Sequence, residues 1–116
     1  MSLDITTIVT LAVVVLFVVF KFVLAKRTPP DVVAEKLKAG ATVLDVRSEA
    51  EFRGGAYRGA INVPLQALSS TLERIPRNRP VVVYCASGAR SAAAVRILQK
   101  AGYADVSNAG GLHHLP

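Results

Sequence analysis

One uninterrupted apolar stretch near the amino end limits what the rest of this chain can fold into. Residues 5–25 read ITTIVTLAVVVLFVVFKFVLA, interrupted only by threonines and by Lys21. As a helix they would span roughly 31 Å, about the thickness of the hydrocarbon core of a bilayer. The remaining chain is too short to surround such a helix on every side. We therefore predict a transmembrane anchor rather than a buried core helix.

The charges at the two ends of this stretch favour an anchor over a cleavable signal peptide. Val23 and Ala25 would suit the small residues of a cleavage site. A signal peptide, however, begins with basic residues, whereas MSLD carries Asp4 and no basic side chain. The basic residues cluster instead at 21–27, on the far side of the stretch. This asymmetry predicts a single-pass membrane protein whose following domain faces the cytoplasm.

The composition changes abruptly after the apolar stretch. Two consecutive prolines in KRTPP oppose continuation of the helix and favour an extended link. We therefore divide the chain into an anchor with its basic flank at 1–27, a linker at 28–30 and one compact domain at 31–116. Residues 31–116 hold 11 basic and 7 acidic side chains, a formal charge of +4, which favours anionic ligands. Scattered basic residues, few aromatic residues and no recognisable nucleic-acid motif argue against nucleic acid as a partner.

The spacing of apolar residues in 31–116 alternates between that of helices and that of strands. Helices are predicted over 31–40, where Asp31 is the expected cap and Gly40 the stop, over 65–75, and from Ser91 to Gly102. Strands are predicted over 42–46, 60–64, 81–84 and 105–108. This order implies an α/β fold with a mainly parallel central sheet flanked by helices.

The single cysteine follows the most apolar of these strands. VVVY at 81–84 has the composition of a central strand, so CASGAR at 85–90 forms the connection to the next helix. Open α/β folds bind ligands at this carboxyl edge of the sheet. One cysteine also excludes an internal disulfide and a zinc site built from several cysteines, and an unpaired thiol suits a reducing compartment.

Two interpretations of Cys85 compete. A lone cysteine is often a small buried apolar residue at a strand end. A loop that curls into a helix amino terminus can instead aim backbone N–H groups and the helix dipole at the sulfur, which lowers the thiol pKa. Gly88 permits the positive φ that such a loop needs, and Arg90 adds a permanent positive charge. The spacing of cysteine, glycine and arginine favours a reactive thiolate.

Two long segments resemble the single-domain rhodaneses, which are thiosulfate and persulfide sulfurtransferases. LDVRSEAEFRGGAYRGAINVPL at 44–65 is similar to the Asp-Val-Arg strand end and the acidic-aromatic helix of that family. VVVYCASGARSAAAVRILQKAGYADVSNAGGL at 81–112 is similar to its cysteine loop and its late Gly-Gly. The chain departs from the family at Ala56, where a histidine is usual, and at Tyr57, where isoleucine is common.

The resemblance implies a persulfide cycle. The Cys85 thiolate would take a sulfur from thiosulfate or a persulfide donor and pass it to cyanide or a thiol acceptor. The family's active-site loop corresponds here to Ala86, Ser87, Gly88, Ala89 and Arg90, and Asp45, Arg47 and Ser91 would support it. For Asp45 and Arg47 a purely structural role is an equally good interpretation. No cofactor and no metal are expected. Apart from the sulfur donor and acceptor, the predicted partner is the membrane, through residues 5–25.

Two alternative functions stay open. One is an enzyme related to phosphatases or arsenate reductases, and the other is a non-catalytic or sulfur-relay docking module at the membrane. Four residues separate Cys85 from Arg90, whereas the related phosphatases and arsenate reductases use five to surround a larger oxyanion, which favours sulfur transfer. Retention of the cysteine argues against an inert module. The adjacent His113 and His114 do not suit one metal ion and are predicted to form a solvent-exposed tail.

Overall fold

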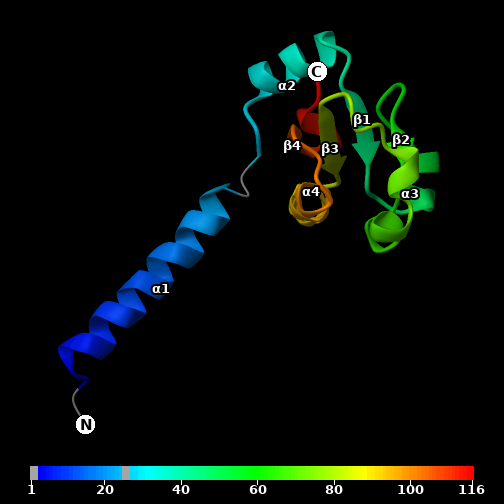
Figure 1. The fold of residues 1–116 in the computed structure, drawn as a ribbon. Helices are drawn as coiled ribbons and strands as arrows, with labels where there is room; N and C mark the ends of the chain where they lie inside the picture. Colours follow the sequence, from blue (N-terminus) through cyan, green and yellow to red (C-terminus); the bar gives the residue numbers. More distant parts are fainter. Residues whose placement is uncertain (1–2, 25–26) are drawn as a thin grey trace.

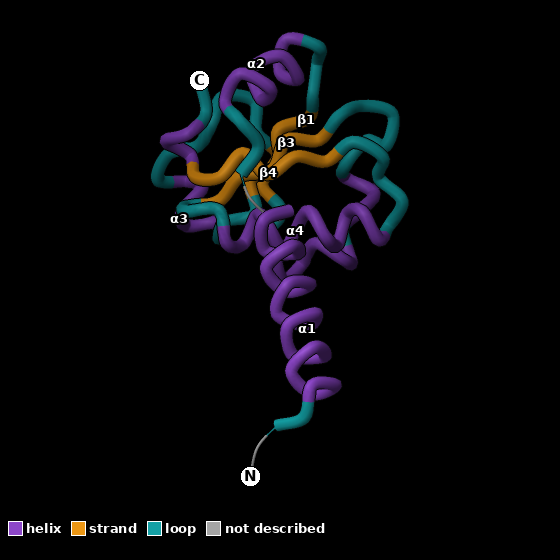
Figure 2. The backbone as a smooth tube through the Cα atoms, turned by 90° about the vertical axis from the view of Figure 1, so that its left-hand side faces the viewer, coloured by secondary structure: helices purple, strands orange, loops and turns teal. Residues whose placement is uncertain are grey.

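The computed structural model describes residues 3–24 and 27–116, an amino-terminal helix followed by an α/β domain (Figure 1). Helix α1, Ile5–Leu24, begins after Asp4, whose Oδ1 accepts a hydrogen bond from the Thr7 N–H at 2.8 Å. Asp4 is therefore an amino-terminal cap. Both views show α1 projecting away from the domain (Figures 1 and 2). Ala25 and Lys26, which end the predicted anchor and belong to its basic flank, lie outside the described residues.

The large apolar side chains described along α1, from Ile5 to Val19, are exposed by 51–79%. Over the part of the chain that the structure describes, no helix combines the length and the apolar character that crossing a membrane requires. The predicted transmembrane anchor at 5–25 is therefore not confirmed.

Four parallel strands form the central sheet of the domain. They are β1 Thr42–Asp45, β2 Ile61–Asn62, β3 Val81–Cys85 and β4 Val106–Gly111, in the order β2-β1-β3-β4. The predicted parallel α/β fold is confirmed. All five residues of β3 are buried, as expected of a strand covered on both faces. The register pairs Asp45 with Tyr84 and Cys85 with Gly111, so the ends of three strands meet at one edge.

Helices cover both faces of the sheet (Figure 2). Helix α2, Pro30–Lys38, contributes Val33 to a core that includes Val82 and Tyr84. Helix α4, Ala89–Lys100, contributes Leu98 to the other core, which includes the side chain of Cys85. Alternate residues of β3 thus face opposite helices, because side chains alternate along a strand. A short helix α3, Glu49–Arg53, follows β1.

Two of the predicted helices differ in the structure. Asp31 lies inside the first turn of α2 and is not its cap, because Pro30 has the fixed φ that suits the first helical position and Pro29 precedes it. The prediction of an α-helix over 65–75 is wrong, since this segment forms two 3₁₀ helices, Leu65–Ser70 and Leu72–Arg74. They are separated by Thr71, whose φ is −132° and whose hydroxyl donates to the Ala67 carbonyl at 2.6 Å.

Candidate active site

Cys85 is the last residue of β3, and its Sγ lies inside the turn that leads into α4. The side chain is fully buried. The Gly88 N–H donates to Sγ at 2.9 Å and the Ser91 N–H donates at 3.4 Å, while Ser91 Oγ lies 3.5 Å from the sulfur. Gly88 has a φ of +109°, which glycine alone adopts readily, and this turn directs the backbone amides inward.

The residues of the loop divide between its two sides. Ala86, Ser87 and Ala89 are exposed, whereas Gly88 and Arg90 are half-buried. The loop therefore presents its backbone to the sulfur and its small side chains to solvent. Helix α4 begins at Ala89, two residues earlier than predicted, so Arg90 belongs to its first turn.

These surroundings favour the ionised form of Cys85. Burial raises the pKa of the thiol, because it penalises the charged form. Hydrogen bonds from the Ser91 hydroxyl and from the backbone N–H groups of Ser91, Gly88 and Ser87 lower the pKa by more, and it lies below its ordinary value. The amino-terminal end of α4 adds partial positive charge at the same place. A thiolate is the nucleophilic form of cysteine.

Arg90 joins the cysteine loop to α3. Its Nη1 and Nη2 donate to the two carboxylate oxygens of Glu51 at 2.7 and 3.0 Å, which is a bidentate ion pair. This pairing with Arg90, helped by the Ser48 N–H, lowers the pKa of Glu51 to about 2. Glu51 also completes a capping box with Ser48 at the start of α3. The S-x-x-E spacing was a sequence signal for that box, but not for the contact with Arg90.

Asp45 and Arg47 form a buried ion pair at the same edge of the sheet. Arg47 Nη2 lies 2.8 Å from Asp45 Oδ2 and donates to the Gly55 carbonyl at 2.7 Å. The Tyr84 hydroxyl donates to Asp45 Oδ2 at 2.7 Å and accepts from the Tyr57 N–H at 3.0 Å. Among the described residues, the hydrogen bonds of this pair brace the segment after α3 and do not reach residues 86–90.

The end of β4 passes directly against the cysteine loop. A Cβ placed on Gly111 would meet the Ala86 carbonyl oxygen at less than 3.0 Å, so only glycine fits this crossing without a shift. The Gly111 N–H donates to His114 Nδ1 at 2.8 Å, and the rings of His113 and His114 lie 3.9 Å apart. The predicted solvent-exposed tail is therefore wrong for His114, which is half-buried, and holds for the exposed His113.

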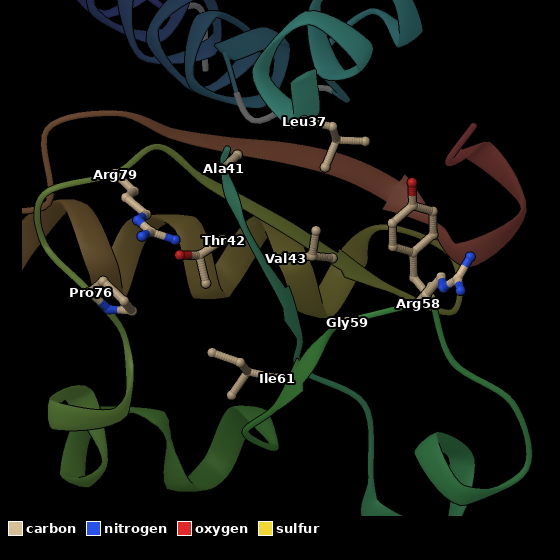
Figure 3. A pocket seen from close by; sticks show the side chains of 10 residues that line it. Leu37, Ala41, Thr42, Val43, Arg58, Gly59, Ile61, Pro76 and Arg79 are labelled. Atoms are coloured by element: carbon tan, nitrogen blue, oxygen red, sulfur yellow. The ribbon is translucent and has the colours of Figure 1, made fainter. Parts of the chain in front are cut away.

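A separate hollow lies at the opposite, amino-terminal end of β1. This cavity of about 430 Å³ is lined by apolar residues such as Leu37, Val43 and Ile61, with Arg58 and Arg79 on either side of β1 (Figure 3). Cys85 and its loop do not line this cavity. The candidate active site is therefore Cys85 with the N–H groups around its sulfur, and not this cavity.

The domain therefore combines a parallel α/β sheet with a buried cysteine at its carboxyl edge, whose sulfur accepts backbone hydrogen bonds. The chain belongs to the rhodanese-like domain family, whose model matches residues 29–113. Two of its relatives, from Allochromatium vinosum and Escherichia coli, are named as sulfurtransferases.

Three similar proteins show the extent of the match. YqhL of Bacillus subtilis is 32% identical over 103 residues, which cover 86% of this chain and 82% of YqhL. The thiosulfate sulfurtransferase PspE of Escherichia coli is 39% identical over 71 residues, 60% of this chain and 68% of PspE. A crystal structure of a rhodanese-like domain protein from Staphylococcus aureus is 28% identical, with a TM-score of 0.66 over 78% of this chain and 91% of that chain.

Proposed function

We propose that this protein is a sulfurtransferase that carries sulfur on Cys85. The donor is thiosulfate or a persulfide, and the acceptor is a thiol or cyanide. The observation that carries the proposal is the set of N–H groups around the Cys85 sulfur, with Gly88 at 2.9 Å and Ser91 at 3.4 Å. Such donors stabilise negative charge on sulfur both before and after sulfur transfer. The relatives named as thiosulfate sulfurtransferases support the same class of substrate.

In the first half-reaction the Cys85 thiolate attacks the outer sulfur of thiosulfate. A new S–S bond forms, the S–S bond of thiosulfate breaks, and its electron pair leaves with sulfite. The outer sulfur of the persulfide then carries the negative charge within reach of the loop N–H groups. In the second half-reaction cyanide attacks that outer sulfur, which gives thiocyanate and restores the thiolate. The cycle needs no external oxidant or reductant.

Mass spectrometry of the intact protein tests this proposal. After incubation with thiosulfate, the protein should gain the mass of one sulfur atom, and cyanide should remove it. Since Cys85 is the single cysteine, a Cys85→Ser protein should show neither change. Thiosulfate turnover that survives this substitution would overturn the mechanism.

The membrane-bound form is a second part of the proposal. We propose that residues 5–25 hold the domain at a lipid bilayer, with the domain in the cytoplasm. The exposed apolar side chains described from Ile5 to Val19, and the basic residues that follow the stretch, support it.

Flotation with phosphatidylcholine vesicles tests the membrane proposal. The full chain should rise with the vesicles, whereas a chain that begins at Arg27 should not. That shorter chain keeps the hydrogen bond from the Thr28 N–H to the Asn108 carbonyl at 2.7 Å. A full chain that stays with unbound protein would refute the anchor. External protease that removes the domain from intact cells would refute the orientation.

A further inference from the structure

A buried hydroxyl stands between the sulfur of Cys85 and an amide of β4. Ser91 Oγ lies 3.5 Å from Cys85 Sγ, 2.6 Å from Asn108 Oδ1 and 3.0 Å from the Gly88 carbonyl oxygen. Ser91 is fully buried and Asn108 is 7% exposed, so water does not substitute freely for these contacts. A hydroxyl has one proton to donate. The sulfur, the amide oxygen and the carbonyl oxygen therefore compete for it.

The orientation of the Asn108 amide decides the first part of this competition. Its Oδ1 accepts from the Gly110 N–H at 2.9 Å, and its Nδ2 donates to the Gly88 carbonyl at 3.3 Å. The reversed amide would set N–H against N–H at Gly110 and oxygen against oxygen at Gly88. Oδ1 therefore faces Ser91. Because Oδ1 only accepts, the short 2.6 Å contact makes the Ser91 hydroxyl its donor.

The consequence for Cys85 depends on its ionisation. When the hydroxyl donates to Asn108, the lone pairs of Ser91 Oγ are free to accept from a neutral Cys85 S–H. A thiolate has no proton to give, and it gains from the hydroxyl only if the hydroxyl turns from Asn108 to the sulfur. Ionisation of Cys85 therefore breaks one short hydrogen bond in order to make another. We propose that Asn108 is a positioning residue for Cys85: its side-chain oxygen holds the Ser91 proton away from the sulfur until the sulfur is charged.

Charged groups near the sulfur also influence the pKa of Cys85. Arg90, in the first turn of α4, interacts electrostatically with Cys85 and is paired with Glu51 of α3. The Asp45 and Arg47 pair lies at the end of β1. Beyond β4, the described titratable groups are Arg27, which lies against Gly110, and His113 and His114. Helix α2 contributes Lys36, which is paired with Asp105, and its other charged side chains are exposed. The contact that joins Asn108 to the sulfur is the Ser91 hydroxyl, 2.6 Å from Asn108 Oδ1 and 3.5 Å from Cys85 Sγ.

The pH dependence of alkylation of the full chain by iodoacetamide measures this directly, because Cys85 is the only cysteine. Ser91→Ala removes a donor to the thiolate and should raise the midpoint of the alkylation profile. Asn108→Ala removes the nearer of the two oxygens that compete with the sulfur for the Ser91 proton and leaves the Gly88 carbonyl at 3.0 Å. It should therefore lower the midpoint by up to about 1 pH unit, the equivalent of at most one ordinary hydrogen bond. In the Ser91→Ala background, Asn108→Ala should leave the midpoint unchanged. Ser107→Ala, on the neighbouring residue of β4, is the control and should not move it.

A second substitution keeps the test decisive if Asn108→Ala fails to fold. Asn108→Asp retains an oxygen for the Gly110 N–H and holds the hydroxyl more strongly, so the midpoint should rise. The rise should be larger with Ser91 present than in the Ser91→Ala background, where only the added negative charge acts. Equal shifts in the two backgrounds, for either substitution, would overturn the proposal.

This inference rests on the proposed function only in that Cys85 is the reactive group. Alkylation needs no sulfur donor, so the two can fail separately. A protein that forms no persulfide from thiosulfate would refute the sulfurtransferase proposal and leave the coupling of Asn108 with Ser91 measurable. Loss of that coupling in a protein that does form the persulfide would refute the positioning role alone.

Discussion

Replacement of Gly111 by alanine should disturb the cysteine loop from outside the loop. The backbone of Gly111 has φ −87° and ψ 163°, which an alanine adopts without strain. The obstacle is space, because the new Cβ would lie within 3.0 Å of the Ala86 carbonyl oxygen, where Cβ contacts essentially do not occur. The carbonyl belongs to the backbone that surrounds Cys85. It must therefore shift by about half an ångström or more, as in other overpacked cores.

The size of the effect follows from this contact. Overpacking of a buried site costs about 1–3 kcal/mol. For a domain of this size each kcal/mol lowers Tm by roughly 4–8 °C. The moved Ala86 carbonyl should also misalign the N–H groups that stabilise the thiolate, so the midpoint of Cys85 alkylation should rise.

Thermal unfolding and alkylation of Gly111→Ala should be compared with Gly54→Ala. Gly54 has φ −76°, and a Cβ there would meet its nearest atoms, the carbonyl oxygens of Ala50 and Glu51, at an ordinary 3.5 Å. The control should keep the wild-type Tm and alkylation profile. If Gly111→Ala behaves like the control in both measurements, the close crossing of β4 and the cysteine loop does not constrain the site.

Three further predictions concern the groups around the loop. Arg90 lowers the pKa of Glu51 to about 2, so the stability that this ion pair contributes is present above about pH 4.5 and is lost as the pH falls towards 2. The urea midpoint should therefore fall less between pH 6 and pH 3 in Glu51→Gln than in wild type. Equal falls in the two proteins would contradict the pairing. Tyr84→Phe should cost about 1–3 kcal/mol in urea unfolding because Asp45 loses a buried donor. Burial and, to a smaller extent, the hydrogen bond to Asp45 raise the pKa of Tyr84 to about 12. The unfolded state therefore loses this proton at a lower pH than the folded state, and the wild type should lose stability between pH 10 and 12. Tyr84→Phe, which has no phenol to ionise, should lose less stability over the same range. The native domain should hydrolyse aryl phosphates negligibly, and one glycine inserted between Ala89 and Arg90 should slow persulfide formation; efficient phosphatase activity of the native protein would favour the alternative function.

The sequence predicted the features that depend on residues close together in the chain. The apolar run 81–84 predicted a buried central strand, and β3 is buried throughout. Gly88 predicted a positive φ between that strand and the next helix, and its φ is +109°. Together these place Cys85 at the carboxyl edge of the sheet. Strand burial and the conformation of a turn are local preferences, and the residues concerned carry them wherever the segment lies.

The spacing of apolar residues gave a wrong prediction where the α-helix and the 3₁₀ helix share the same sequence pattern. Apolar residues three to four positions apart between 65 and 75 suit an α-helix, but they suit a 3₁₀ turn nearly as well. In the structure Thr71, with a φ of −132°, interrupts the segment, which forms two 3₁₀ helices.

Only the tertiary structure decided which distant side chains meet at Cys85. Arg90 and Glu51 are 39 positions apart in the chain and come together because α3 and α4 both lie at the carboxyl edge of the sheet. Asn108 reaches Ser91 because β4 lies beside β3 in a register that pairs Gly111 with Cys85. Such contacts depend on strand order, register and helix position, which the whole core determines, and no short stretch of sequence contains that information.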